Sequence, residues 1–366
     1  MKKYIGLSII VLLVFMVGSI HAFEIKAVWA HPGDLGKNEA DVKAFFELLE
    51  KCHINLVFPL VKGSGGAIFW HSRKFPGAIH PDYKDFDMLG AAVKYARQYN
   101  IKIHPWLCDF TESKNSAAFR THPEWAQLNP QGGYTSDEKL GGGRPYNPIW
   151  MCPVRRPGYV DQWLIPMFEE IVREYDVDGI HHDYVRYPGD VAPDSYCFCD
   201  VCLEHYMTYN HFAYTSRPDD RIDLKIVLPR KESNWINDLT LKPADWETMS
   251  RAEKARYLLE GKSINRNDLD YYFYTTRCDA ITSFVKEVTD RCRVINPAVE
   301  VSAAVFINPM RSARHIGQRW TDFAPWVDIL APMNYRSHFQ GGFEDYLAYL
   351  MDYVKMQMKW AGKNSV

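Results

Sequence analysis

Residues 175–188, YDVDGIHHDYVRYP, decide the fold: a short apolar segment ends in a cluster of ionisable and aromatic side chains. Side chains alternate along a strand, which places His181 and Asp183 on one side and His182 and Arg186 on the other. A carboxylate near arginine is costly in an apolar core, because each buried polar group needs a partner. We therefore predict that this strand ends at a functional site with Asp183 at its centre.

Apolar segments of strand length alternate with helical patterns along the rest of the chain. Helical patterns occupy residues 39–52, 88–99 and 160–175. Strands are predicted at residues 24–30, 54–61, 102–108, 179–187, 299–306 and 327–334. This alternation indicates βα units around a parallel sheet. The fold class is α/β, and a TIM (β/α) barrel is the simplest arrangement, with functional residues at the C-terminal ends of its strands.

Two connections are longer than a barrel needs, and the barrel is expected to be incomplete. Insertion loops at about 111–158 and 188–268 follow the third and fourth strands and are expected to form walls of a cleft. Only one further helix, at about 343–360, is predicted after the sixth strand, so six of the eight strands of a barrel are visible. An open sheet of this kind would leave a strand edge exposed.

The first 22 residues have the pattern of a signal peptide. Lys2 and Lys3 precede an uncharged apolar run, and Ala22 is a small residue suited to cleavage. We expect export to the periplasm, the cell surface or the medium, with no stable membrane span after cleavage; an uncleaved anchor is the alternative. Residues 23–366 then form one barrel domain, of unknown oligomeric state.

The charge balance argues against nucleic acid as a partner. The formal net charge of −2 becomes −4 once Lys2 and Lys3 are removed. Nucleic-acid-binding domains are usually strongly basic, so no nucleic-acid partner is expected.

Five motifs between about residues 24 and 360 form a recognisable set. They are 27–29 (AVW), Asn55, 104–106 (HPW), 178–188 (DGIHHDYVRYP) and 328–335 (DILAPMNY). Together they resemble the bacterial glycosyl-hydrolase-like family 10 and its relatives. The resemblance implies a TIM barrel acting on glycosidic bonds, in a group whose substrates include peptidoglycan glycan strands and other polysaccharides. It also implies a chain that continues past the sixth strand.

Hydrolysis of a glycosidic bond generally uses two carboxyl groups. The group looks distantly related to α-galactosidase-type barrels, whose nucleophile ends the fourth strand, and this implies Asp183 as nucleophile. Asp109 and Glu112, after the third strand, are candidates for the second carboxylate; a merely solvated position is the alternative for each, and the acid could lie on a missing strand. Asp178 and Asp328 lie near strand starts and are expected to be structural.

Side chains near the strand ends are candidates to stack on a sugar ring and to form hydrogen bonds with it. They are Trp29, His31, His104, Trp106, His181, Arg186, Tyr187, Asn334 and Tyr335. Arg186 could bind the carboxylate of an acidic sugar or of a peptide stem, but a bidentate pair that orients Asp183 is favoured. Interior packing is the alternative for His104 and Trp106.

A cysteine cluster follows the fourth strand. Cys197, Cys199 and Cys202 have C-x-C-x-x-C spacing, and Cys152 follows the third strand. Four thiolates suit a closed tetrahedral zinc site, and a similar cluster in family 42 β-galactosidases implies structural zinc beside the barrel mouth. Disulfides are the alternative in an exported chain. No organic cofactor is expected, because neither glycine-rich stretch has a phosphate-loop pattern.

The sequence therefore predicts an exported TIM-barrel glycoside hydrolase that acts on an oligo- or polysaccharide. A catalytically silent glycan-binding protein on the same barrel is an alternative, because no second carboxylate is obvious. A metal-dependent hydrolase that uses the histidines near the mouth is another.

Overall fold

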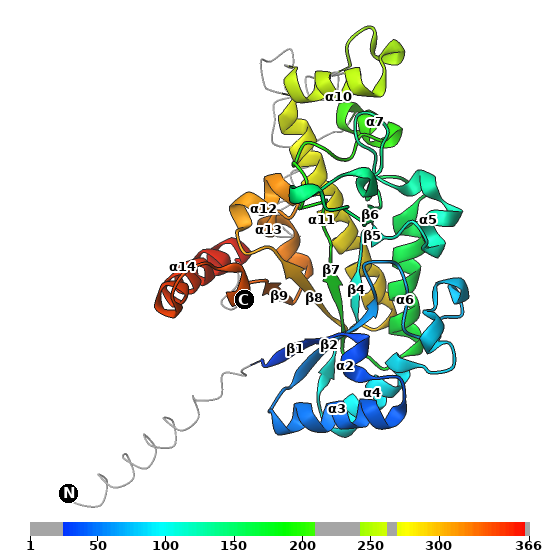
Figure 1. The fold of residues 1–366 in the computed structure, drawn as a ribbon, viewed down its shortest axis with the longest axis vertical. Helices are drawn as coiled ribbons and strands as arrows, with labels where there is room; N and C mark the ends of the chain where they lie inside the picture. The colour runs from blue at the N-terminus through cyan, green and yellow to red at the C-terminus, as the bar shows by residue number, and fades with distance from the viewer. Residues whose placement is uncertain (1–24, 209–241, 262–268, 363–366) are drawn as a thin grey trace, which may run out of the picture.

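The protein forms a curled parallel sheet with helices on its outer side, seen here in a computed structural model that describes residues 25–208, 242–261 and 269–362 (Figure 1). The predicted signal peptide at 1–22 lies outside these ranges, as does part of the predicted loop at 188–268. No helix among the described residues is long and apolar enough to cross a membrane.

The sheet follows chain order from one edge to the other. Its strands are β1 (Ala27–Ala30), β2 (Leu56–Lys62), β3 (Lys102–Ile103), β4 (Trp106–Cys108), β7 (Gly179–Asp183), β8 (Glu300–Val305) and β9 (Ile329–Pro332). Every pairing between neighbours is parallel, and in the described part of the chain β1 and β9 are the two edges. This half-barrel confirms the predicted incomplete α/β barrel.

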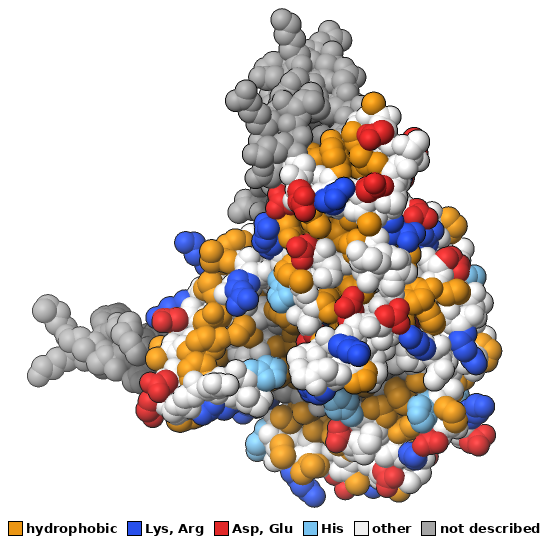
Figure 2. Space-filling view, turned by 45° about the horizontal axis from the view of Figure 1, so that its top comes forward, with side chains coloured by type: hydrophobic (Ala, Val, Ile, Leu, Met, Phe, Trp, Pro, Cys, Tyr) orange, Lys and Arg blue, Asp and Glu red, His pale blue; other side chains and the backbone are white. Residues whose placement is uncertain are grey.

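Helices lie in the connections between the strands and after the last strand. The longer connecting helices are α3 (Glu39–Lys51), α4 (Met88–Gln98), α6 (Ile165–Glu174) and α11 (Asp270–Ile295). The others are α2 (Pro32–Leu35), α5 (Ala117–Thr121), α7 (Asp200–Thr208), α10 (Arg251–Glu260), α12 (Pro309–Ile316), α13 (Trp320–Phe323) and α14 (Phe343–Ala361). A two-stranded antiparallel sheet pairs β5 (Thr111–Glu112) with β6 (Ile149–Trp150). The face in Figure 2 carries acidic and basic side chains interspersed with hydrophobic ones.

The strands are generally shorter than the sequence predicts, and for two of them the physical reason is visible. The third is divided into β3 and β4 at Pro105, which has no N–H to contribute to a ladder. The fourth ends at Asp183 instead of Tyr187, because Tyr184 has a φ of 51°. Alternation therefore stops there, and the prediction that Arg186 lies on the side opposite Asp183 is wrong: both line one pocket.

Asp178 and Asp328 tie the starts of two strands, as predicted. Asp178 accepts hydrogen bonds from Arg97 at 2.7 Å and from the backbone of β3 at 2.9 Å. Asp328 accepts from Arg293 at 2.9 Å and from the backbone of β8 at 2.7 Å. Both carboxylates thus fix strand register at the amino end of the sheet.

A hydrogen-bond network centred on Ser302 crosses the concave side of the sheet. The Ser302 hydroxyl lies 2.9 Å from His181 Nδ1 and 3.0 Å from His104 Nδ1. Trp29 donates to His181 Nε2 at 3.0 Å, so a neutral His181 carries its proton on Nδ1. Burial lowers the pKa of His181 well below its usual range, and His104 Nε2 lies 3.2 Å from Glu300. The network joins side chains from β1, β7, β8 and the break in the third strand.

We expect Ser302→Ala to reduce the free energy of unfolding by roughly 2–4 kcal/mol, because it leaves two buried imidazole nitrogens without a partner. Urea denaturation measures the change. Ser337→Ala, at an exposed position, is the control and should stay within about 0.5 kcal/mol of wild type. Equal stability of the two variants would show that the network contributes nothing.

Candidate active site

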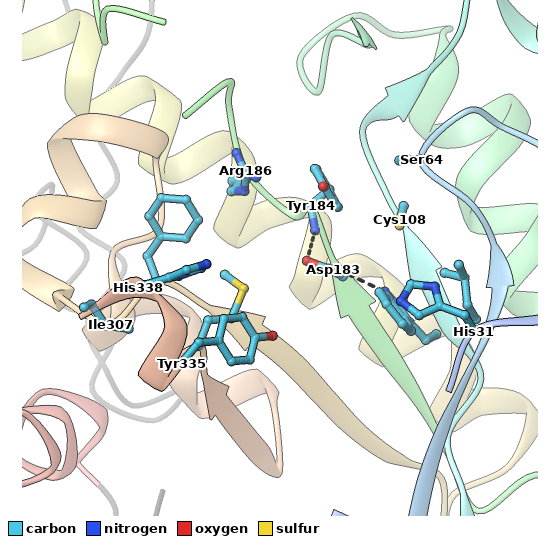
Figure 3. Close-up of a pocket in the computed structure, with 13 residues that line it drawn as sticks. His31, Ser64, Cys108, Asp183, Tyr184, Arg186, Ile307, Tyr335 and His338 are labelled. Carbon is cyan, nitrogen blue, oxygen red and sulfur yellow. Dashed lines mark hydrogen bonds between the residues drawn. The ribbon is translucent and has the colours of Figure 1, made fainter. Parts of the chain in front are cut away.

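A pocket of about 480 Å³ opens at the carboxyl ends of the strands. Figure 3 shows Asp183 at its centre, between one wall with His31 and Cys108 and a second wall with Tyr335 and His338. The complete lining is His31, Leu60, Ser64, Trp106, Cys108, Asp183, Tyr184, Arg186, Phe306, Ile307, Met333, Tyr335 and His338. Its volume, its aromatic side chains and its place at the strand ends are typical of small-molecule sites in α/β barrels.

Asp183 is the one carboxylate among the described residues that line the pocket. Its Oδ2 accepts a hydrogen bond from Trp106 Nε1 at 3.1 Å, and its Oδ1 accepts from the backbone N–H of Tyr184 at 2.6 Å. Burial raises the pKa of Asp183 to about 6, although the positive charge of Arg186 and both hydrogen bonds favour the ionised form. The group therefore changes charge near neutral pH.

Arg186 contributes a positive charge to the same pocket without forming an ion pair with Asp183. Its guanidinium carbon lies 4.9 Å from the ring centroid of Trp150, 4.7 Å from that of Tyr184 and 4.8 Å from that of Phe306. The bidentate pair that the sequence favours is absent among the described residues. Tyr184 turns the chain after β7, so the guanidinium packs among aromatic rings instead.

Asp109 lies next to β7 in the sheet but points away from the pocket. Its backbone N–H donates to the carbonyl of Asp183 at 2.7 Å, whereas its Oδ2 lies 2.8 Å from His182 Nδ1. His182 packs against Phe168 of α6, so the pair is buried between the sheet and the helices. The expectation that Asp109 faces Asp183 is corrected: the two side chains lie on opposite sides of the sheet.

Glu112 is also buried outside the pocket. It forms an ion pair with Lys62 at 3.2 Å and accepts a hydrogen bond from the Tyr159 hydroxyl. Lys62 donates in addition to the carbonyls of Cys108 at 2.6 Å and Thr111 at 3.0 Å. The structure therefore does not bring Glu112 together with Asp183, and its contacts join the end of β2 to β4 and β5.

The predicted sugar-binding residues divide into two groups. His31, Trp106, Arg186 and Tyr335 line the pocket with Asp183. Those outside the lining are Trp29, His104, His181, Tyr187 and Asn334.

The residues outside the lining pack or form hydrogen bonds within the protein. Trp29, His104 and His181 belong to the Ser302 network. Tyr187 packs against the guanidinium of Arg277 at 4.3 Å. Asn334 donates to Gln357 of α14 at 3.1 Å. The polar groups of the other four form hydrogen bonds within the protein, whereas the Tyr187 hydroxyl is buried without a partner among the described residues. None of the five lines the pocket with Asp183, and sugar contact by them stays a prediction.

Several lining residues were missed from the sequence. Phe306 directly follows β8, and His338 lies in the short turn Arg336–His338 after β9. Tyr184 follows β7. Tyr184 and Phe306 directly follow a strand, so the criterion that singled out Asp183 at a strand end would have found them if applied to every strand. His338 lies six residues beyond the end of β9, and no comparable signal marks it.

Four buried cysteines form a compact group. The Sγ atoms of Cys152, Cys197, Cys199 and Cys202 all lie within 4.8 Å of one another, and none forms a disulfide. Cys152 Sγ lies 3.4 Å from Cys202 Sγ and 3.8 Å from Cys199 Sγ. A tetrahedral ion with bonds of ~2.3 Å to sulfur separates its ligands by about 3.8 Å. The residues therefore fit a metal ion, and no other group of three ligating side chains converges in the described parts of the chain.

This fold, with its carboxylate and aromatic side chains at the strand ends, defines a glycosidase-like α/β barrel protein. Residues 24–362 match the family model described as glycosyl hydrolase-like 10, and the chain belongs to that family. No curated protein matches it.

Solved β-galactosidases share the fold. The enzyme from Bacillus circulans sp. alkalophilus is 12% identical with a TM-score of 0.55, and the match covers 92% of this chain and 43% of that one. The enzyme from Rahnella sp. R3 is 15% identical with a TM-score of 0.55, covering 91% and 42%. That from Marinomonas ef1 is 12% identical with a TM-score of 0.53, covering 85% and 41%. The chain thus spans less than half the length of these enzymes.

We expect Trp106→Phe to raise the pKa of Asp183 above 6, because the ionised carboxylate loses a hydrogen-bond donor. A carboxyl ¹³C NMR titration, assigned with Asp183→Asn, measures the pKa. Trp163→Phe is the matched control, since it removes an indole N–H that has no partner among the described residues, from a ring that packs against Phe75 outside the pocket. An unchanged pKa in Trp106→Phe would contradict the assigned role of the indole.

Proposed function

We propose that the protein is an exported glycoside hydrolase, in which Asp183 acts on a glycosidic bond of an oligo- or polysaccharide. The observation that carries this proposal is a single buried carboxyl group with a pKa of about 6 at the centre of a pocket at the strand ends. The family and the fold supply the class of chemistry.

Asp183 is suited to be the nucleophile. Each of its oxygens accepts an N–H hydrogen bond, from Trp106 and from the backbone of Tyr184. Such donors stabilise the ionised carboxylate, and protonation of either oxygen would weaken one of them. The carboxylate is thus held in a fixed orientation for attack at a sugar carbon.

The pocket walls are suited to a sugar ring. Trp106 and Tyr335 offer aromatic surface, and His31 packs edge-on against Trp106 with ring centroids 5.1 Å apart. Aromatic side chains with a polar edge combine apolar contact with hydrogen bonding, which matches the two kinds of surface on a saccharide.

A glycan-binding protein without catalytic activity is the second candidate. Asp183 is the one carboxylate in the described lining, and Asp109 and Glu112 are buried behind it. Hydrolysis generally requires a second carboxyl group, so this observation favours binding without turnover.

We expect Asp183→Asn to reduce kcat/KM on a cleaved glycan by roughly 100-fold or more while sugar binding is retained. Hydrolysis of a glycan panel that includes peptide-free peptidoglycan strands is measured beside isothermal titration of the same glycans. Because the nucleophile must be ionised, wild-type kcat/KM should fall as the pH drops below about 6.

His205→Asn, outside the pocket lining, is the control for this substitution. A loss of activity as the pH rises above about 6 would assign Asp183 as the acid instead. Unchanged turnover in Asp183→Asn would exclude the hydrolase mechanism, and binding without cleavage by wild type would support the glycan-binding candidate.

We also propose that Cys152, Cys197, Cys199 and Cys202 hold a structural zinc ion. Four sulfur ligands fill the coordination shell, so no position is left for a catalytic water. A bound ion would therefore act only as a cross-link between the segments that carry the cysteines. The cross-link would join β6 to the start of α7.

We expect Cys199→Ser to lower the zinc content and to lower Tm by roughly 5 °C or more, since it removes one of four ligands. Zinc is measured by inductively coupled plasma mass spectrometry and Tm by calorimetry. Cys52→Ser, at an exposed free thiol, should leave both unchanged. A wild-type protein purified without zinc, and unaffected by chelators, would refute this proposal.

A further inference from the structure

Arg186 has a full positive charge, little exposure and few hydrogen bonds. The residue is 7% exposed, yet it lines the pocket. Of the five N–H donors of its guanidinium, one is used by the described residues: Nη1 donates to the carbonyl of Tyr187 at 3.3 Å. Within the same part of the chain its Nε is buried without a partner, and no carboxylate forms an ion pair with the guanidinium.

The surroundings fix the guanidinium in place. Trp150 comes from β6, Tyr184 from the turn after β7 and Phe306 from the end of β8, and all three ring centroids lie within 4.9 Å of the guanidinium carbon. Aromatic faces attract a cation but provide no hydrogen-bond acceptor for its N–H groups. The rings therefore orient the guanidinium and leave its hydrogen-bonding capacity available to a ligand.

An anionic group is the ligand that suits such a site. A desolvated cation without an opposite charge is costly, and a carboxylate matches the fork of guanidinium donors with two parallel hydrogen bonds. Asp183 does not fill this role: the charge of Arg186 favours its ionised form, but no hydrogen bond or ion pair joins the two side chains among the described residues. Since the described residues supply one acceptor to the guanidinium, a molecule bound in the pocket is free to supply the others.

We propose that Arg186 is the receptor for a carboxylate carried by the bound saccharide, so that the substrate is an acidic glycan. This inference rests on the proposed function, since it assigns specificity to the same pocket. The carboxylate can belong to a hexuronic acid or to a lactyl ether on an amino sugar. A neutral glycan leaves Arg186 without an acceptor and binds more weakly.

The test compares an acidic glycan with its own neutral form. Two oligosaccharides are used, one of hexuronic acid and one of N-acetylated amino sugars with lactyl ethers, each beside its carboxyl-reduced counterpart. Binding to Asp183→Asn is measured by isothermal titration, so that cleavage does not interfere. We expect roughly 10- to 100-fold tighter binding of one acidic form over its neutral counterpart. The pair that shows it identifies the source of the carboxylate.

Replacement of Arg186 isolates its contribution. In the Asp183→Asn background, Arg186→Gln should bring the ratio of acidic to neutral affinity close to one without weakening the neutral form. Arg186→Lys keeps the positive charge but lacks the two parallel N–H donors of a guanidinium. It should retain part of the preference for the acidic over the neutral glycan. Thermal melting checks that both variants fold. If Arg186→Gln does not fold, the salt dependence of the ratio with Arg186 intact replaces it, and a ratio that does not fall at high salt counts against the proposal.

The outcomes separate this inference from the proposed function. Equal affinity for acidic and neutral forms, or no binding of either acidic glycan, overturns the role of Arg186 even if wild type cleaves neutral glycans. A preference for the acidic form that disappears in Arg186→Gln supports the role of Arg186 even if wild type cleaves nothing.

Discussion

The hydrogen bonds that converge on the Ser302 hydroxyl hold the strands in the positions on which the pocket depends. His181 of β7 and His104, in the break between β3 and β4, both contact this one oxygen. Their second ring nitrogens contact Trp29 and Glu300. Imidazole groups without partners would be costly in this buried space. Because each contact requires a particular register, the network favours the arrangement in which the strand ends meet around Asp183. The buried hydrogen bonds of the Ser302 network thus help to fix the positions of the strand ends that form the pocket.

A single backbone conformation determines what the pocket contains. Tyr184 has a positive φ, which ends β7 at Asp183 and turns the following residues toward the cavity. Arg186 consequently reaches the same pocket as Asp183, while Asp183 keeps a hydrogen bond to the Tyr184 backbone. The resulting pair of charges is close enough to influence each other and too far apart to neutralise each other. A regular strand through Tyr187 would have separated them by the thickness of the sheet.

The fold was predictable because it depends on periodic patterns, whereas much of the site depends on contacts that cross the sheet. Strand positions, their parallel order and the structural roles of Asp178 and Asp328 follow from local sequence. The direction of Asp109 does not, because its hydrogen bond to His182 depends on how two strands align. The packing of aromatic rings around the Arg186 guanidinium could not be predicted from the sequence either, since the rings come from segments far apart in the chain.

The four-cysteine group has a consequence for how the pocket is assembled. Cys152 lies two residues after Trp150, one of the three rings against which the Arg186 guanidinium packs. Cys197, Cys199 and Cys202 lie in the segment that follows the turn at Tyr184. Oxidation of the thiols or loss of a ligated ion would therefore alter the position of a pocket wall from a distance. If the four thiols hold an ion, as we propose, formation of the binding surface would depend on the redox state of these thiols and on the supply of that ion.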